Sequence, residues 1–361
     1  MIKSFRVDRF RGIRDLDVKN LNQINLIVGD NNSGKTSVLE ALQLLSKPGD
    51  LSNFYRVARS REPISALGGT TLYESVTCLF TKEGEDLSLG VEAEFDNTRI
   101  SCQAKGKEER IVVDPAEIAG TTSSLFELIG EQEAEQFQGK INYSYGSKQG
   151  TTQIKINTYS KSGGTLIPKN RLIRMAYIAP CDHLKGNLIS QIVRVSGYKE
   201  VCVKALQLFD EDIEDILVLK SPIGGRGVDY IKHNQLGMMP LSTFGDGIKK
   251  VLVLANAIAQ AADGILLIDE VETAIHKKYY DNIFNFIVKA CKAFNVQLFV
   301  TTHSIEAVDG LLATQEYEKQ DVMDDISVIT IKKENGKSYS RVLAGRDVAG
   351  DREAFGFEVR L

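Results

Sequence analysis

The sequence lacks several features that would assign it to other classes of protein. Its five cysteines are odd in number and form no Cys-x-x-Cys pair, and its four histidines lack zinc-finger spacing. This usage favours free thiols in a reducing cytosol. No apolar run reaches the roughly 20 residues that span a bilayer, and the first five residues hold no apolar signal core. We therefore expect a cytoplasmic protein with no membrane partner.

A surplus of positive charge is also missing. Lysine and arginine number 44 against 48 aspartates and glutamates, which gives a net charge of -4. Coating a nucleic acid backbone needs a clear positive surplus, so the total charge does not indicate a nucleic acid partner, although a local basic patch is compatible with it. The 43% of hydrophobic and 25% of charged residues are typical of a soluble globular protein.

Short apolar segments alternate with helical periodicities along most of the chain. This alternation predicts an α/β fold with a parallel sheet covered by helices. Strands are expected at 3–10, 24–28, 172–178, 265–268 and 296–301, and helices at 35–45, 247–262 and 283–291. After His303 we expect a strand pair and a closing helix.

Two regions differ from this pattern. Residues 51–170 indicate a β-rich antiparallel insertion, with strands at 75–80 and 154–159 and a helix at 116–137. Residues 186–222 indicate a helical subdomain, because Ala205, Leu206, Phe209, Ile213 and Ile216 would share one face of a helix. We expect residues 1–361 to form a single domain that contains both.

A complete phosphate-loop motif follows the segment 24–28. Residues 29–36 fit G-x-x-x-x-G-K-[ST] at every fixed position, with a strand expected before and a helix after. The glycines let backbone N–H groups turn toward phosphate oxygens, Lys35 would reach the β- and γ-phosphates of ATP, and Thr36 would bind Mg²⁺. The ATP-binding residues predicted here are Gly29, Asn31, Asn32, Ser33, Gly34, Lys35, Thr36 and Ser37.

Two further strand ends carry polar residues. Ile265-Leu266-Leu267-Ile268 is followed by Asp269 and Glu270. Carboxylates at the carboxyl end of a central strand face the nucleotide crevice, so Asp269 is predicted to hold Mg²⁺ and Glu270 to polarise the attacking water. His303 follows the strand expected at 296–301 and is predicted to act at the γ-phosphate. Lys35, Glu270 and His303 are thus the predicted catalytic residues.

A second anion site is possible at residues 241–247, Leu-Ser-Thr-Phe-Gly-Asp-Gly, which precede a helix. Backbone N–H groups, a hydroxyl and the helix dipole would together attract a phosphate. Simple capping of the helix by Ser242 or Asp246 explains the same residues equally well.

The order of these motifs resembles that of ABC-type ATPase heads, in particular the RecF/SMC/OLD branch. More closely, the chain resembles stand-alone AAA-type ATP-binding proteins of prokaryotic genomes, which often lie in phage-defence loci. The residues that carry this resemblance are Phe10-Arg11-Gly12-Ile13, Ser242-Thr243-Phe244-Gly245-Asp246-Gly247, Asp269-Glu270-Val271-Glu272, His276, the segment 295–304 and Phe357-Glu358-Val359-Arg360. The similarity thins out between about 51 and 170.

The resemblance implies a dimer with ATP sandwiched between two protomers. One protomer would supply the phosphate loop and the acid pair, and its partner would supply the signature residues Ser242, Gly245, Asp246 and Gly247. Arg11 matches a family position that reaches the nucleotide. The chain departs from the family where Ile275-His276-Lys277 replaces the usual Leu-His-Pro. No Q-loop glutamine is assigned.

Three functions fit this resemblance to different degrees. The first is an ATPase that controls a separately encoded effector, such as a nuclease, in phage defence, because no effector motif is visible on the chain. The second is a RecF-like repair ATPase that clamps DNA on binding ATP, which the negative net charge weakens. The third, a transporter subunit, fits the signature poorly, and a GTPase fits less well because Asn-Lys-x-Asp is missing.

Overall fold

A six-stranded sheet forms the centre of the computed structural model, which describes residues 1–61, 70–113, 132–160, 172–184, 189, 192–220, 227–317 and 324–360. The strand order is β16-β15-β3-β14-β13-β9, and all neighbours are parallel except the hairpin of β15 and β16. The strands are β3 (Ile24–Val28), β9 (Met175–Ile178), β13 (Ile265–Ile268), β14 (Gln297–Thr301), β15 (Ile326–Glu334) and β16 (Lys337–Ala344). Every residue of β3 and β13 is buried, as expected for parallel strands that are covered on both faces.

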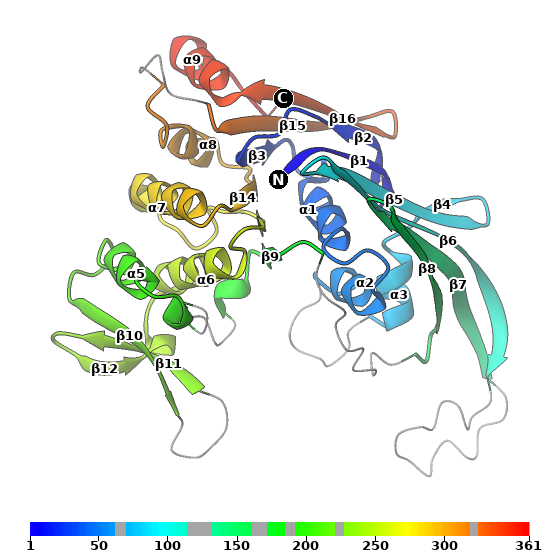
Figure 1. Cartoon of the computed structure of the whole chain (residues 1–361), viewed down its shortest axis with the longest axis horizontal. Helices are drawn as coiled ribbons and strands as arrows, with labels where there is room; N and C mark the ends of the chain where they lie inside the picture. Colours follow the sequence, from blue (N-terminus) through cyan, green and yellow to red (C-terminus); the bar gives the residue numbers. More distant parts are fainter. Residues whose placement is uncertain are drawn as a thin grey trace.

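One face of this sheet is covered by three helices and a second, antiparallel sheet (Figure 1). The helices α1 (Lys35–Leu44), α2 (Leu51–Ala58) and α3 (Leu72–Thr77) lie between the two sheets. The antiparallel sheet consists of β1 (Ile2–Phe10), β2 (Ile13–Val18), β4 (Thr81–Glu83), β5 (Asp86–Phe95), β6 (Thr98–Val113), β7 (Gln132–Tyr145) and β8 (Lys148–Asn157). β1 pairs with both β2 and β5, so the strands within 51–170 continue a sheet that starts at the beginning of the chain.

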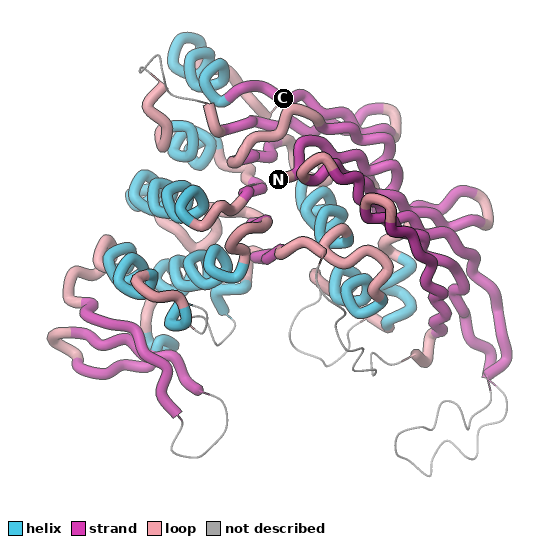
Figure 2. Tube along the Cα trace, viewed as in Figure 1, coloured by secondary structure: helices cyan, strands magenta, loops and turns pink. Residues whose placement is uncertain are grey.

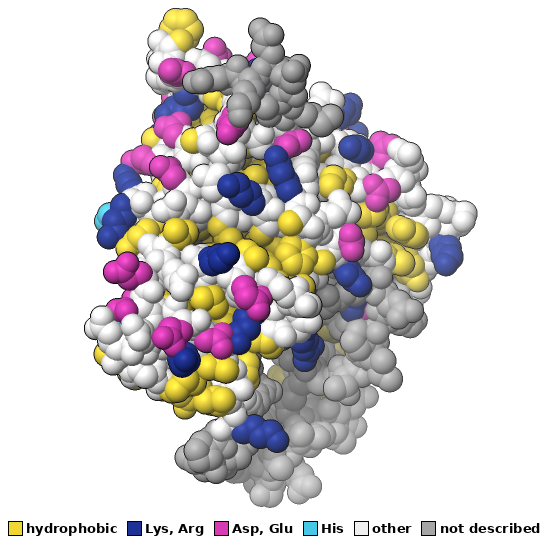
Figure 3. All heavy atoms as spheres, turned by 60° about the vertical axis from the view of Figure 1, so that its left-hand side comes forward, with side chains coloured by type: hydrophobic (Ala, Val, Ile, Leu, Met, Phe, Trp, Pro, Cys, Tyr) yellow, Lys and Arg dark blue, Asp and Glu magenta, His cyan; other side chains and the backbone are white. Residues whose placement is uncertain are grey.

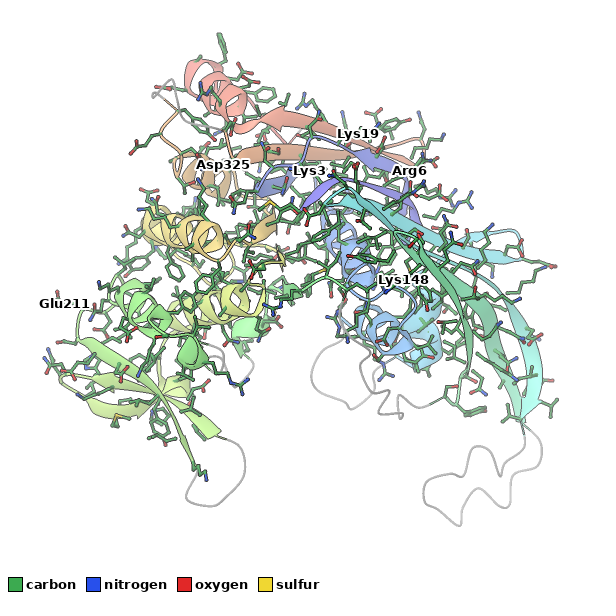
Figure 4. All side chains as sticks on the ribbon, in the orientation of Figure 1. Lys3, Arg6, Lys19, Lys148, Glu211 and Asp325 are labelled. Carbon is green, nitrogen blue, oxygen red and sulfur yellow. The ribbon has the colours of Figure 1, made fainter. Side chains whose placement is uncertain are left out.

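The opposite face is covered by helices, as the tube in Figure 2 shows. They are α5 (Tyr198–Leu206), α6 (Asp246–Gln260), α7 (Tyr280–Ala293), α8 (Ile305–Leu312) and α9 (Gly345–Phe355). An ion pair of 2.6 Å between Lys292 Nζ and Asp325 ties α7 to the start of β15, and Figure 4 labels Asp325 there. The strand pair and closing helix expected after His303 are β15, β16 and α9.

A small antiparallel sheet lies beside α5 and α6. It consists of β10 (Ile213–Lys220), β11 (Gly227–His233) and β12 (Gly237–Pro240). Hydrophobic side chains that remain exposed on it include Val218, Leu219, Val228 and Met238. Figure 3 shows hydrophobic side chains gathered at the lower part of the face that carries this sheet.

The helical subdomain expected at 186–222 is wrong for its second half. Tyr198–Leu206 is helical, but Ile213–Lys220 is the strand β10, and Glu211 lies in the turn between them (Figure 4). Ile213 and Ile216 are buried from a strand that pairs with β11. The backbone hydrogen-bond partners of β10 come from β11, which follows later in the chain, and the periodicity of residues 205–216 contains no signal for that pairing. Of the expected range, 186–188, 190–191 and 221–222 lie outside the described residues.

Two expectations for 51–170 are also corrected. Residues 75–80 are expected as a strand, but 75–77 are the end of α3 and 78–80 form a turn. The helix starts at a capping box in which Thr71 and Glu74 bond reciprocally. Of the expected helix 116–137, residues 116–131 lie outside the described part of the chain. Residues 132–137 form strand β7, because pairing with β6 overrides local helix propensity.

Candidate functional site

The phosphate loop connects β3 to α1 in the conformation that its glycines allow. Gly29 has φ of 144° and Gly34 has φ of 104°, both in the region that favours glycine. A Cβ on Gly29 would lie 2.3 Å from the carbonyl oxygen of Ile331. Gly29 is therefore required both for its backbone angles and for its close approach to β15.

Lys35 lies at the start of α1 and folds back over the loop. Its Nζ donates to the carbonyl oxygens of Gly29 at 2.7 Å and Asp30 at 2.9 Å. Burial lowers the pKa of Lys35, and the carboxylates of Asp269 and Glu270 oppose that shift. The ammonium group therefore lies between the loop and the acid pair, where triphosphate oxygens could replace the two carbonyl partners.

Asp269 is held by two hydroxyl groups, one from the start of α1 and one from the end of β14. Thr36 Oγ1 donates to the Asp269 carboxylate at 2.9 Å, and Thr301 Oγ1 donates to it at 2.6 Å. Burial raises the pKa of Asp269, and the hydrogen bonds from Thr301 and Thr36 oppose the rise. The two predicted metal-binding residues, Thr36 and Asp269, are thus in direct contact.

Glu270 has a strained backbone. Its φ is 48°, a left-handed value that costs a non-glycine residue about 1–3 kcal/mol. Its backbone N–H donates to Thr301 Oγ1 at 2.9 Å, so one hydroxyl links both members of the acid pair. Thr273 Oγ1 donates to the Glu270 carboxylate at 3.4 Å. These bonds hold the peptide in place and leave the carboxylate partly exposed at the end of β13.

His303 is oriented by Glu272. Its Nδ1 lies 3.2 Å from Glu272 Oε1, and the backbone N–H groups of His303 and Ser304 donate to the same oxygen at 3.1 and 3.3 Å. The imidazole is 54% exposed. With Nδ1 engaged, Nε2 is the ring nitrogen that can meet a ligand.

Arg11 and Ser37 belong to a charged cluster beside α1. The fully buried carboxylate of Glu40 lies 2.8 Å from Arg11 Nε and accepts two hydrogen bonds of 2.7 Å from Arg61. Arg61 Nη2 also donates to Ser37 Oγ at 2.9 Å. The structure thus places Arg11 one helical turn from the phosphate loop, while its contact with nucleotide stays a prediction.

The signature residues lie apart from the phosphate loop. Ser242, Gly245 and Asp246 are exposed at the start of α6, and Asp246 Oδ1 accepts from Lys249 at 3.1 Å. Among the residues that the structure describes, no hydrogen bond or ion pair joins this segment to the loop 29–36. His276 has a capping role, because its Nδ1 accepts from the backbone N–H of Lys278 at 3.2 Å.

Two residues of the site were not predicted from the sequence. Thr301 joins Asp269 to Glu270, and Glu272 orients His303. Thr301 lies at the end of β14, within the segment 295–304. Glu272 lies two residues after the acid pair, at the end of the segment Asp269-Glu270-Val271-Glu272. Their position beside the assigned residues was the available signal.

Two parts of the chain match known protein families. Residues 1–179 match the AAA ATPase domain family. Residues 196–309 match a family described as AAA domain, putative AbiEii toxin, Type IV TA system. The first match contains the phosphate loop, and the second contains the signature segment, the acid pair and His303.

Relatives align over nearly the whole chain at low identity. An ATP/GTP phosphatase of Helicobacter pylori is 24% identical and covers 89% of this chain and 90% of its own length. The DNA replication and repair protein RecF of Rickettsia conorii is 20% identical, with 86% of this chain and 96% of RecF covered.

Solved structures share the fold. An SMC head bound to the C-terminal winged-helix domain of ScpA superposes with a TM-score of 0.51 at 14% identity and covers 95% of this chain and 97% of its own. An SMC head from Pyrococcus furiosus with an extended coiled coil gives a TM-score of 0.51 at 11% identity and covers 99% of each chain. The solved structures show that the fold is that of an SMC head, and the two family matches with the RecF relative support an ABC-type ATPase of the RecF/SMC branch.

Proposed function

We propose that this ATPase hydrolyses ATP with Mg²⁺ in a nucleotide-sandwich dimer and thereby controls a separately encoded effector. The observation that carries the proposal is the convergence of Lys35, Thr36, Asp269 and Glu270 at the carboxyl ends of β3 and β13, while Ser242, Gly245 and Asp246 are exposed at the start of α6. One protomer thus holds only part of an ABC-type site.

The residues present fit a magnesium ion. Mg²⁺ prefers oxygen ligands, and the hydroxyl of Thr36 and the carboxylate of Asp269 already meet at 2.9 Å. When bound, the ion would neutralise charge on the β- and γ-phosphates. Thr301 keeps the Asp269 carboxylate in place from its other side.

Each remaining residue has a separate task in this scheme. Lys35 exchanges its carbonyl partners for phosphate oxygens. Glu270 accepts a proton from the attacking water, and Thr301 and Thr273 fix its position. His303, held by Glu272, presents Nε2 to the γ-phosphate. The partner's signature segment then closes the site with backbone N–H groups and a helix dipole.

The effector is proposed from the second family match. That family is described as a putative toxin of a type IV toxin–antitoxin system. Such a system has two protein components, so the match supports a function that involves a second, separately encoded protein. The phage-defence role and the nuclease identity of the effector belong to this proposal. No helix among the described residues is long and apolar enough to cross a membrane.

Native mass measurement tests the proposal. With ATP and Mg²⁺ the chain is expected at twice its monomer mass, and addition of the protein encoded by a neighbouring gene is expected to give a heavier complex. The matched control uses ADP in place of ATP. The proposed assembly is contradicted if the chain stays monomeric with ATP and Mg²⁺, or if it binds none of the proteins encoded by neighbouring genes.

A specific observation keeps DNA clamping as the second candidate. The outer face of the antiparallel sheet has a groove of about 470 Å³ lined by Arg9, Lys105, Lys107, Lys140 and the acidic Asp86, among others. Lys107 lies 3.4 Å from Asp86, which leaves a cationic surplus across five strands. The RecF relative also favours this function.

If the groove binds a nucleic acid backbone, Lys105→Gln with Lys140→Gln should weaken DNA binding and lower the salt slope by about 2, since each phosphate contact contributes about 0.9. Fluorescence anisotropy with a labelled duplex at several salt concentrations measures both. Lys289→Gln on α7 is the control and should leave both unchanged. Absence of ATP-dependent DNA binding by the parent protein would eliminate the clamp function.

A further inference from the structure

The chain that follows α9 returns to the central sheet at strand β15. Thr330 Oγ1 on β15 donates to the carbonyl oxygen of Val359 at 2.7 Å, and the Val359 side chain is fully buried in the core beneath it. Arg352 Nη1 on α9 donates to the carbonyl oxygen of Phe357 at 2.6 Å. These contacts fix the path of the backbone up to Arg360, the next residue.

Arg360 reaches the loop that carries His303. Its Nη1 donates to the backbone carbonyl oxygen of His303 at 2.8 Å, across 57 positions of the chain. Its Nε and Nη2 each donate to the Glu358 carboxylate at 2.7 Å. Such a fork of two parallel hydrogen bonds holds the guanidinium plane in one orientation. The ion pair with Glu358 therefore keeps Nη1 in place against the His303 peptide.

The backbone of His303 is thus held at both of its polar groups. Its N–H donates to Glu272 Oε1 at 3.1 Å, and its carbonyl oxygen accepts from Arg360. Glu272 belongs to the loop after β13, whereas Arg360 belongs to the chain after α9. Because the imidazole is 54% exposed, packing alone does not fix its position. The two backbone contacts are therefore what sets the place from which the ring extends.

We propose that Arg360 is a positioning residue for ATP hydrolysis, which holds the His303 peptide where the imidazole meets the γ-phosphate. The inference deepens the proposed function and rests on it, because His303 is assigned to the γ-phosphate there. The side chains of Arg360 and Glu358 are 34% and 36% exposed. Ion pairs with this exposure add little to stability, so we expect the loss of Arg360 to affect turnover more than folding.

Arg360→Gln separates these two effects. The amide is shorter and uncharged, so the fork to Glu358 and the donor to the His303 carbonyl are both lost. We expect kcat to fall about 10- to 100-fold, as for other small losses of geometry, while the KM for ATP stays within about threefold. The melting temperature should equal that of the parent. Arg99→Gln, which removes an exposed arginine–glutamate pair between β5 and β6, is the matched control and should change none of these quantities.

A double-mutant cycle with His303→Ala gives the second measurement. Alanine keeps the carbonyl oxygen that Arg360 contacts but removes the imidazole. The double variant should therefore be no slower than His303→Ala alone, since Arg360 acts through that ring. Glu358→Gln keeps the guanidinium but weakens the fork, so it should lower kcat by a smaller factor than Arg360→Gln.

Parental kcat in Arg360→Gln, or losses that multiply in the double variant, would overturn the proposal. So would a melting temperature that falls together with kcat in both Arg360→Gln and Glu358→Gln, because the effect would then be one of folding. Failure of the proposed function is distinguishable, because the parent chain itself would then show no ATP turnover.

Discussion

Glu270→Gln is expected to bind ATP normally and to hydrolyse it about 2–4 orders of magnitude more slowly than the parent chain. The amide keeps the shape of the carboxylate but is a poor proton acceptor, so the attacking water loses its base. The backbone bond from Glu270 to Thr301 does not involve the side chain and should survive the substitution. Single-turnover hydrolysis with Mg²⁺ measures the rate, and equilibrium binding of labelled ATP measures affinity.

The same variant should accumulate as an ATP-bound dimer. Size-exclusion chromatography with ATP and Mg²⁺ is expected to shift Glu270→Gln, but not the parent after its ATP is consumed, to the dimer position. Glu306→Gln is the matched control, because Glu306 lies at the start of α8 and bonds to Lys277 and Ser304 away from Asp269. Equal rates for Glu270→Gln and the parent would leave another group to position the water.

The sequence was sufficient to predict which candidate residues converge where each motif fixes its own local geometry. Gly29, Gly34 and Lys35 define a loop whose shape depends on neighbours in the chain. The acid pair and His303 follow apolar strands, and parallel strands bring their carboxyl ends to one edge. The central sheet was predicted for the same reason, since its buried strands are short and mostly apolar.

Long-range pairing explains the elements that were predicted incorrectly. Ile213–Lys220 has the spacing of an amphipathic helix in its first residues, yet the strand β11 binds it from beyond residue 226. Residues 132–137 are strand because β6 lies next to them. In α3 the reverse holds, because the capping box of Thr71 and Glu74 is a local signal that outweighs the β-branched content.

Contacts between distant segments are likewise absent from any motif. Glu272 meets His303 across 31 positions, and Thr36 meets Asp269 across 233. The pairing of Arg11 with Glu40 also depends on how β1 packs against α1. Patterns within one segment identify which residues carry chemistry, whereas the packed structure determines which residue orients which.

The central claim is that each ATP site is shared between two protomers. Lys35→Ala removes the charge that is proposed to contact the phosphates. Gly247→Arg adds a bulky cation at the signature segment, where an added Cβ would lie 3.3 Å from Phe209 Cε1. Each variant alone is expected to have almost no turnover, because both sites of its dimer carry the same lesion. A mixed dimer, by contrast, has one site with both lesions and one site with neither.

Mixing the two variants with different affinity tags therefore tests the shared site most directly. Tandem purification isolates the mixed dimers and proves subunit exchange, and their ATPase rate is then measured. We expect turnover to return to a fraction of the parent rate, at most about half, since one of two sites is intact. Purified mixed dimers without activity, or a strictly monomeric parent with full ATPase activity at every protein concentration, would contradict the shared site.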